Sequence, residues 1–109
     1  MVKIRWNEEA LNDISEIAEY IASDSITYAI IEVETFFERV EILKSNPHIG
    51  KIVAELNDEY VRQLVEGNYR IIYEIKNVST IEILCVIHGR RLLKNHPTFL
   101  RKTKARTSG

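Results

Sequence analysis

The chain has few of the features that mark secreted, membrane-spanning or nucleotide-binding proteins. Its single cysteine, Cys85, cannot form a disulfide within the chain, and its four glycines are scattered, so they form no phosphate-binding loop. No run of about 18 apolar residues is present that could span a membrane. The N-terminal segment has neither the apolar core nor the cleavage site of a signal peptide. We therefore expect a cytoplasmic protein with no membrane partner, in which Cys85 is a buried structural thiol.

Metal-binding and nucleophilic motifs are also missing. The three histidines, His48, His88 and His96, are dispersed, and no cysteine–histidine pair has the spacing of a zinc site. No serine lies in a Gly-x-Ser-x-Gly motif. We therefore expect no metal ion and no cofactor.

Acidic residues are absent from the last part of the chain. Residues 1–87 hold all 16 acidic residues and eight of the 15 Lys and Arg, a net charge of −8, whereas residues 88–109 hold the other seven and no acid, a net charge of +7. This polarity favours an acidic or polyanionic partner, although a solvated tail would show it too. We predict one domain over residues 1–93 and a basic, partly disordered C-terminal tail over residues 94–109.

Two helices are predicted by apolar residues at helical spacing. Asn7 is a suitable N-cap for the first helix, which should end near Ser23. Asp24 or Ser25 can cap the second helix, which should stop before Asn46-Pro47 because the residue before a proline avoids the helical region. So short a connection predicts an antiparallel helical hairpin.

Strands are predicted at the N-terminus and again after the helices. Alternation of apolar and polar residues indicates a first strand over residues 2–6, and β-forming residues indicate three more over residues 61–65, 69–75 and 80–88. Residues 51–59 form a connection without pattern. The order β-α-α-β-β-β predicts an α+β fold, with the helical hairpin packed on an antiparallel sheet that includes the N-terminal strand.

Strand geometry predicts that Arg70 and His88 lie on one face of this sheet. If the turn at residues 77–79 pairs Ile75 with Ile81, then His88 is diagonal to Arg70 on the same face. An arginine can hold a phosphate and a histidine can transfer protons near neutral pH, so together they could cut RNA. A shift of one residue in the pairing would place the two side chains on opposite faces.

The same register predicts which face of the sheet the other residues of strands 69–75 and 80–88 occupy. It predicts that the helices cover the more apolar face, which holds Tyr69, Ile71, Tyr73, Ile83, Cys85 and Ile87. The alternative to a catalytic site is that Arg70 pairs with Glu66 or Glu74, while His88 caps the end of its strand.

Residues 61–73, VRQLVEGNYRIIY, resemble the RelE/ParE toxin family, whose members read V-R-x-L, a short turn and Y-R-I-I-Y. Residues 86–91, VIHGRR, resemble the closing V-x-H-x-R-R of that family. Upstream, Leu43, Pro47 and Gly50 fit its L-x-x-x-P-x-x-G turn. The resemblance covers residues 2–93, with the motifs in the family's order.

The resemblance implies a toxin of a type II toxin–antitoxin system, which inhibits growth and is neutralised by a cognate antitoxin. ParE-like members bind DNA gyrase, whereas RelE-like members bind the ribosome and cleave mRNA. In the cleaving branch the residues that match Arg70 and His88 are catalytic, and an aromatic or basic residue follows the histidine. Here Gly89 follows it, and the acidic body of the chain disfavours binding to a polyanion such as the ribosome.

We therefore predict a ParE-like toxin that binds DNA gyrase. The alternatives are a RelE-like, ribosome-dependent mRNA endonuclease that uses the arginine and histidine above, and an inert relative that only binds the antitoxin. The resemblance makes Arg62, Tyr73, Arg90 and Arg91 candidates for contacts with the target or the antitoxin. Because Arg90 and Arg91 have no acidic neighbours in sequence, we expect acidic residues of the antitoxin to meet them.

Overall fold

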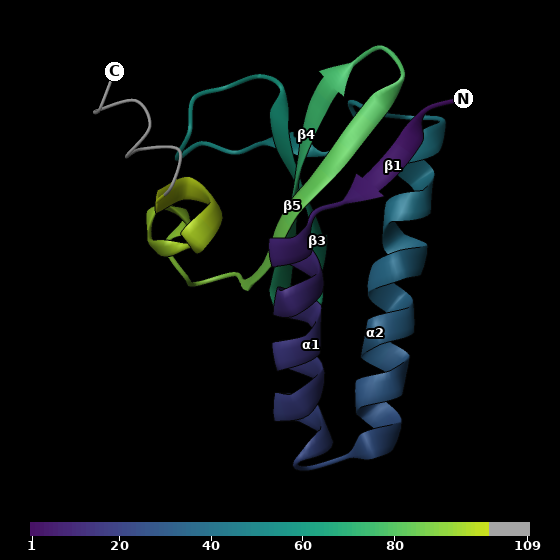
Figure 1. Ribbon diagram of the computed structural model, residues 1–109, viewed down its shortest axis with the longest axis vertical. Helices are drawn as coiled ribbons and strands as arrows, with labels where there is room; N and C mark the ends of the chain where they lie inside the picture. The colour runs from purple at the N-terminus through teal and green to yellow at the C-terminus, as the bar shows by residue number, and fades with distance from the viewer. Residues whose placement is uncertain (101–109) are drawn as a thin grey trace.

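The computed structural model describes residues 1–100, which form the predicted α+β fold of one strand, two helices and a group of strands (Figure 1). The elements are β1 (Lys3–Trp6), α1 (Glu8–Ala22), α2 (Ile26–Val40), the 3-10 helix η1 (Glu41–Lys44), β2 (Lys51–Ile52), β3 (Val61–Glu66), β4 (Tyr69–Asn77), β5 (Thr80–His88) and the 3-10 helix η2 (Leu93–Asn95). Within these residues, no helix combines the length and the apolar character needed to cross a membrane.

The two helices form an antiparallel hairpin whose starts are fixed by side-chain caps. Asn7 Oδ1 accepts a hydrogen bond from the Ala10 N–H at 2.7 Å, and Ser25 Oγ accepts one from the Tyr28 N–H at 3.1 Å. One end of the hairpin packs on the sheet, whereas the end with the connecting turn projects beyond it (Figure 1). Part of each helix therefore has no sheet against it.

The strands form one sheet of five in the order β1-β5-β4-β3-β2. The predicted antiparallel meander of β3, β4 and β5 is confirmed, and β1 joins the sheet as predicted. Because β1 runs parallel to β5, the sheet is mixed. The unpatterned connection contributes one short strand, β2, which pairs with β3. Gly67 has a φ of 57° in the tight turn between β3 and β4, a conformation that favours glycine.

A β-bulge in β5 changes the pairing between β4 and β5. Near the turn the predicted register holds, with Ile75 opposite Ile81. Further along, Ile72 is opposite Cys85, and Leu84 is an extra residue with no partner on β4. A bulge of this kind shifts the register by one residue and reverses the alternation of side chains in the rest of the strand.

This reversal corrects two of the predictions about the sheet faces. Arg70 is opposite Ile87, and both lie on the face away from the helices, together with Cys85. Val86 and His88 lie on the helix face instead. The predictions that Cys85 and Ile87 face the helices, and that Arg70 and His88 share one face, are therefore wrong. The cause is a single extra residue in the strand.

Apolar side chains are buried on both faces of the sheet. The cluster under the helices consists of Ala10, Ile14, Phe36, Val40, Leu43, Leu64, Ile71, Tyr73, Ile81, Ile83 and Val86. The cluster on the opposite face consists of Val53, Val61, Ile72, Leu84, Cys85, Ile87, Leu93 and Phe99. Cys85 is a fully buried free thiol, as predicted.

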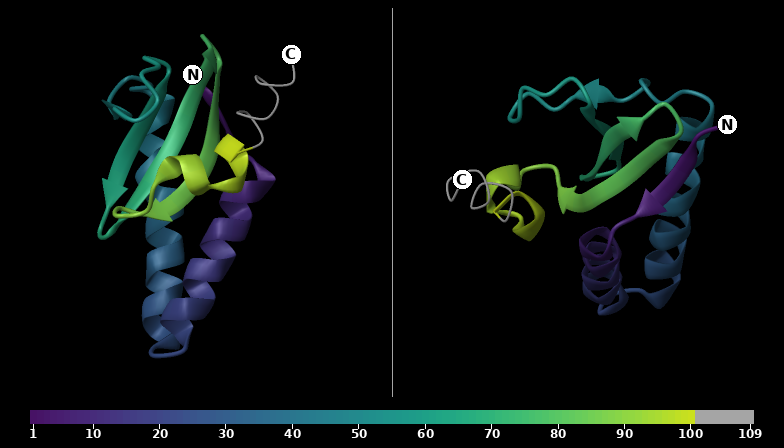
Figure 2. Two further views of the ribbon diagram at one scale, coloured as in Figure 1. Left: turned by 90° about the vertical axis from the view of Figure 1, so that its left-hand side faces the viewer. Right: turned by 45° about the horizontal axis from the view of Figure 1, so that its top comes forward.

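The packed chain continues past residue 93, where the sequence led us to end the domain. Leu93 and Phe99 belong to the second cluster, and His96 between them is fully buried. These turns lie beside the sheet on the side away from α2 (Figure 2). Residues 94–100 are thus part of the fold, while residues 101–109 of the predicted tail lie outside the described residues.

Candidate functional site

Arg70 is held on the second face of the sheet by three different segments. Its guanidinium donates to the two Glu55 carboxylate oxygens at 2.7 and 3.3 Å, to Gln63 Oε1 at 3.2 Å and to the backbone carbonyl of Arg91 at 2.8 Å. The side chain is only 12% exposed. The partner Glu55 differs from Glu66 and Glu74, which the sequence offered as alternatives.

The pairing with Arg70 also changes the acidity of its partner. The hydrogen bond from Arg70 lowers the pKa of Glu55, although partial burial of that carboxyl acts in the opposite direction. The charged pair joins β4 to the connection after β2, and the bond to Arg91 joins both to the C-terminal turns. Arg70 therefore acts as a structural clamp, with its terminal nitrogens already engaged.

His88 lies on the helix face at the open end of β5. It is opposite Tyr69 in the sheet, and the two rings meet edge to face with their centroids 5.8 Å apart. Its Nδ1 accepts a hydrogen bond from the Arg90 N–H at 3.2 Å, so the side chain of His88 caps the end of the strand. The side chain is exposed and lies on the opposite face of the sheet from Arg70.

A shallow groove lies beside His88, between α1 and the ends of β4 and β5, with both apolar and polar residues in its lining. It has a volume of about 200 Å³, and its polar lining residues are Asp13, Glu16, Tyr20, Tyr69, His88 and Arg91. Groups of both charges thus meet at this groove. The groove therefore brings together His88 and Arg91, two of the candidate residues from the sequence. Arg70 does not line it.

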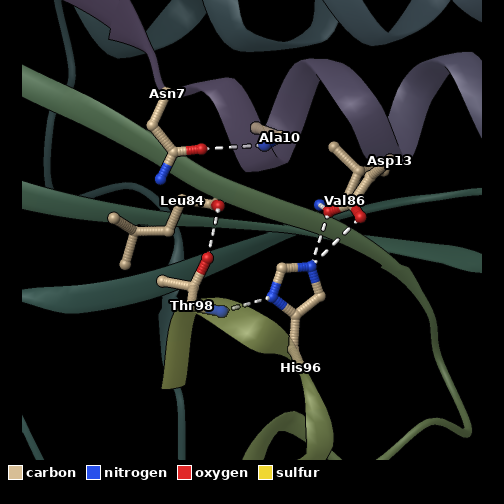
Figure 3. A network of polar contacts seen from close by, with 7 residues as sticks. All are labelled: Asn7, Ala10, Asp13, Leu84, Val86, His96 and Thr98. Atoms are coloured by element: carbon tan, nitrogen blue, oxygen red, sulfur yellow. Dashed lines mark hydrogen bonds and ion pairs between the residues drawn. The ribbon is translucent and has the colours of Figure 1, made fainter. Parts of the chain in front are cut away.

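Asp13, which lines this groove, also belongs to a network of polar contacts with His96, Thr98 and the backbone of β5 (Figure 3). His96 Nε2 is 2.9 and 3.1 Å from the two carboxylate oxygens of Asp13, and His96 Nδ1 accepts from the Thr98 N–H at 3.2 Å. Because Nδ1 accepts, the proton is on Nε2 and points to Asp13. Burial raises the pKa of the Asp13 carboxyl, even though the bonds from Val86 and His96 act against that rise.

The network covers an edge of β5 that β1 leaves open. The pairing of β1 with β5 ends at Ile83, so beyond it β5 has β4 on one side and no strand on the other. The Val86 N–H donates to Asp13 at 2.9 Å, and the Thr98 hydroxyl donates to the Leu84 carbonyl at 3.5 Å. Asp13 and Thr98 therefore satisfy backbone groups that would otherwise be buried without partners.

Among residues 1–100, the donor atoms of Asp13, Cys85 and His96 form one group, within 4.8 Å of one another, that could hold a metal ion. Two features fit such an ion poorly. Burial raises the pKa of the Cys85 thiol, which disfavours the thiolate that binds metals. An imidazole bound through Nε2 would carry its proton on Nδ1, where His96 accepts the Thr98 N–H. The arrangement is better described as a hydrogen-bonded pair.

Arg62 and Tyr73 hold the turn at Pro47 and Gly50. The Tyr73 hydroxyl donates to the Pro47 carbonyl at 2.8 Å and accepts from the Gly50 N–H at 2.9 Å, and Arg62 donates to the Gly50 carbonyl at 3.0 Å. A Cβ at Gly50 would lie 2.6 Å from the Tyr73 hydroxyl and 2.7 Å from the Gln63 carbonyl. The side chain of Tyr73 is fully buried, so a partner has no access to it.

Arg90 and Arg91 are both exposed just after β5. Within the described part of the chain, neither side chain forms an ion pair with a carboxylate. These two arginines are thus the predicted binding residues whose charges are available to a partner.

The sequence did not reveal the Asp13–His96 pair. Asp13 fitted the polar face of a helix, and His96 lay in a segment that the cluster of basic residues suggested was a tail. The available signal was the pair of apolar residues Leu93 and Phe99, which flank His96 and are both buried. Their presence would have argued for a packed segment in place of a solvated one.

One family model matches the chain, and solved structures share its fold. The model of the family described as "ParE toxin of type II toxin-antitoxin system, parDE" matches residues 4–93. A chain of the chromosomal ParDE system from P. aeruginosa is 22% identical, with a TM-score of 0.66 over 81% of this chain and 96% of that one. A chain of the toxin–antitoxin complex RelBE2 from Mycobacterium tuberculosis is 21% identical, with a TM-score of 0.53 over 80% and 96%. No curated protein matches. At these identities the structural likeness shows the fold.

Proposed function

Because the chain belongs to the ParE toxin family of type II toxin–antitoxin systems, we propose that it inhibits growth by binding DNA gyrase and is neutralised by a cognate antitoxin. The choice of gyrase follows the ParE-like motifs of the sequence. One structural observation supports binding over RNA cleavage: Arg70 and His88 lie on opposite faces of the sheet.

A nuclease needs its phosphate-binding and proton-transferring groups to reach the same scissile bond. The guanidinium of Arg70 is occupied by Glu55, Gln63 and the Arg91 carbonyl, and it is nearly buried. Releasing it would leave the Glu55 carboxylate without its partner. The pair that would cut RNA is therefore separated by the sheet, and one of its members already has a structural role.

The charge of the chain supports the same choice. Residues 1–87 carry a net charge of −8, from eight Lys and Arg against 16 acidic residues. Affinity for RNA comes mainly from Lys and Arg that neutralise phosphates, and salt weakens it. A protein target suits this acidic body better than the RNA of the ribosome does.

The antitoxin is the second partner in this proposal. Arg90 and Arg91 are exposed, and neither forms an ion pair within residues 1–100, so their charges are available to acidic residues of the antitoxin. Arg62 and Tyr73 contribute indirectly, because they fix the turn at Gly50. Replacing Arg90 and Arg91 together by alanine should weaken antitoxin binding, and unchanged affinity would remove this part of the proposal.

RelE-like mRNA cleavage is the second candidate function, and one observation supports it. The groove beside His88 contains Glu16 and Arg91, so it holds an acid, a base and a cation without Arg70. A nuclease of this kind would not depend on Arg70. Loss of RNA cleavage in His88→Ala but not in Arg70→Lys would favour it.

Controlled expression in a bacterium separates these functions. A gyrase poison should induce the DNA-damage response and filamentation, whereas an mRNA endonuclease should stop translation rapidly and leave cleaved transcripts. We expect the first result, and expect it to persist in His88→Ala. Rapid translation arrest with cleaved mRNA would contradict the proposal, and normal growth would favour the inert relative.

A further inference from the structure

Residues 92–100, which we call the strap, close over the open edge of β5. Leu93 and Phe99 lie near the two ends of the strap and are buried in the cluster on the second face of the sheet. His96 lies between them and is fully buried. Figure 3 shows the imidazole of His96 pointing from the strap toward Asp13 of α1. This ring is thus the polar link between the strap and α1.

Both ring nitrogens of His96 have a partner, and each partner requires one protonation state. Nε2 carries the proton and donates to the two Asp13 carboxylate oxygens, at 2.9 and 3.1 Å. Nδ1 has a lone pair and accepts the Thr98 N–H at 3.2 Å. A proton added at Nδ1 would remove this acceptor and bring two N–H groups together. The closed strap therefore fits the neutral imidazole.

The charged and titratable groups around His96 come from α1, from β5 and from the turn after β5. Asp13 attracts an imidazolium, whereas Arg91, whose charge acts on Asp13, repels one. The Cys85 sulfur lies within 4.8 Å of the donor atoms of Asp13 and His96, and burial raises the pKa of this thiol, so it stays neutral. Burial of the whole ring disfavours its charged form. Among these groups, only Asp13 favours a protonated ring inside the closed strap.

We propose that residues 92–100 form an acid-sensitive strap, which closes over β5 while His96 is neutral and opens when this histidine takes up a proton. In the open state water solvates the imidazolium and the Thr98 N–H. Opening removes the Thr98 hydroxyl from the Leu84 carbonyl and leaves Asp13 without the histidine that positions it beside the Val86 N–H. The outer edge of β5 thereby becomes accessible.

The start of the strap has a second attachment, which mild acid leaves in place. Arg70 donates to the Arg91 carbonyl at 2.8 Å, and the Glu55 carboxyl that pairs with Arg70 also forms a hydrogen bond with the Leu93 backbone. Arg70 holds the pKa of Glu55 below its ordinary value, so Glu55 stays charged at the pH where a histidine is protonated. The strap therefore opens from its far end, with residues 91–93 as the hinge.

The direction of the pH effect follows from proton uptake. The open strap exposes a histidine that binds a proton at about pH 6.5, whereas the closed strap has no place for this proton, so acid favours opening. Between about pH 7.5 and about pH 5.5 the ratio of open to closed strap should rise by about tenfold. Asp13 acts in the opposite direction, because burial raises its pKa and the closed state binds a proton there more readily. The effect therefore belongs to pH values above the protonation of Asp13.

The test is amide hydrogen exchange of the full chain, followed residue by residue by NMR and corrected for the intrinsic exchange rate at each pH. Protection of the Val86 and Thr98 amides should fall by about tenfold between about pH 7.5 and about pH 5.5. Both amides should be less protected than that of Ile71 in β4, because the strap opens without global unfolding. Equal protection of all three amides, or protection that does not change with pH, would overturn the proposal.

Three variants identify the titrating group. His96→Gln can donate to Asp13 but takes up no proton, so protection of the Val86 amide should no longer change with pH. The matched control is His48→Gln, at an exposed histidine, which should keep the tenfold change. Asp13→Asn keeps an acceptor but loses the attraction for an imidazolium, so the change should be at least as large as in the native chain. A pH dependence that persists in His96→Gln or disappears in Asp13→Asn would contradict the proposal.

A measurement on the native chain keeps the proposal testable if His96→Gln does not fold. The NMR signals of the His96 ring should titrate with the same midpoint as the protection of the Thr98 amide. Different midpoints for the ring and the amide would show that another group opens the strap, and would overturn the proposal.

Discussion

The surroundings of the sheet and the free end of the hairpin use their charged residues in opposite ways. On the second face of the sheet Arg70 is paired with Glu55, and at the edge of β5 Asp13 of α1 is bonded to His96; each pair joins segments that are distant in sequence. On the hairpin, Glu19 and Glu34 face a groove and form no ion pair within residues 1–100. The first region is built to hold the fold, while the second is open to a partner.

The residues that carry the family motif are therefore different from the residues that are exposed to a partner. Arg70 and Tyr73 belong to the stretch that identifies the family, yet the terminal nitrogens of Arg70 and the Tyr73 hydroxyl bond to other parts of the same chain. The hairpin end carries no motif, but it has exposed apolar residues and unpaired acids. Substitutions should therefore reduce stability in the first region and affinity in the second.

The largest loss of stability is expected for Asp13→Ala. It removes the acceptor for the Val86 N–H and the partner of His96, whose side chain is 1% exposed, so two buried donors are left unpaired. We expect about 3 kcal/mol less free energy of unfolding, measured by denaturant titration. Asp13→Asn retains an acceptor and should lose less. A loss below about 0.5 kcal/mol for alanine would contradict a structural role for this pair.

Arg70→Lys tests whether the motif arginine is structural. Lysine keeps the charge but lacks the planar fork, so it cannot bond Glu55, Gln63 and the Arg91 carbonyl together. We expect a loss of about 2 kcal/mol in the free energy of unfolding. The folded variant should inhibit gyrase as well as the native chain does. A folded variant that no longer inhibits gyrase would break the comparison, because Arg70 would then act on the target.

Tyr73→Phe should have a smaller effect on stability. It removes the hydroxyl that donates to the Pro47 carbonyl and leaves the Gly50 N–H without its acceptor. The expected loss is about 1 kcal/mol, measured by thermal or denaturant unfolding. Tyr28→Phe is the control, because that side chain is 68% exposed on the hairpin. Equal losses of stability at the two sites would argue against a stabilising role for the Tyr73 hydrogen bonds at Pro47 and Gly50.

The smallest expected effect is a pH dependence that comes from Glu55. Arg70 holds the pKa of Glu55 below its ordinary value of 4.5, so the folded state favours the ionised carboxyl. The resulting stability is present above about pH 4.5 and is lost as the pH falls through the lowered pKa. The stability difference between the native chain and Glu55→Gln should therefore shrink on acidification. A difference that is constant with pH would contradict the pairing.

The fold could be predicted because the hydrophobic pattern changes period between the helices and the strands. Asn7 and Ser25 cap the helices as the sequence indicated, and Gly67 makes the tight turn between β3 and β4. The parallel direction of β1 could not be predicted, because its alternation is compatible with either direction of pairing. Local patterns specify elements more firmly than they specify how distant elements meet.

The geometry of the candidate site could be predicted less well. The bulge at Leu84 lies within a continuous apolar run, where either face of the sheet accepts the same residue types, so no local signal marks the extra residue. That one residue moves His88 to the opposite face from Arg70. The partner Glu55 was also missed, because it lies in a connection without pattern and is brought to Arg70 only by the tertiary structure.

Inhibition of DNA supercoiling by purified gyrase tests the central claim most directly. The native chain and its folded Arg70→Lys and His88→Ala variants should inhibit supercoiling to a similar extent, and the cognate antitoxin should reverse the inhibition. Under the same conditions none of them should cleave mRNA on ribosomes. Unimpaired supercoiling together with ribosome-dependent cleavage of mRNA that requires His88 would contradict the account.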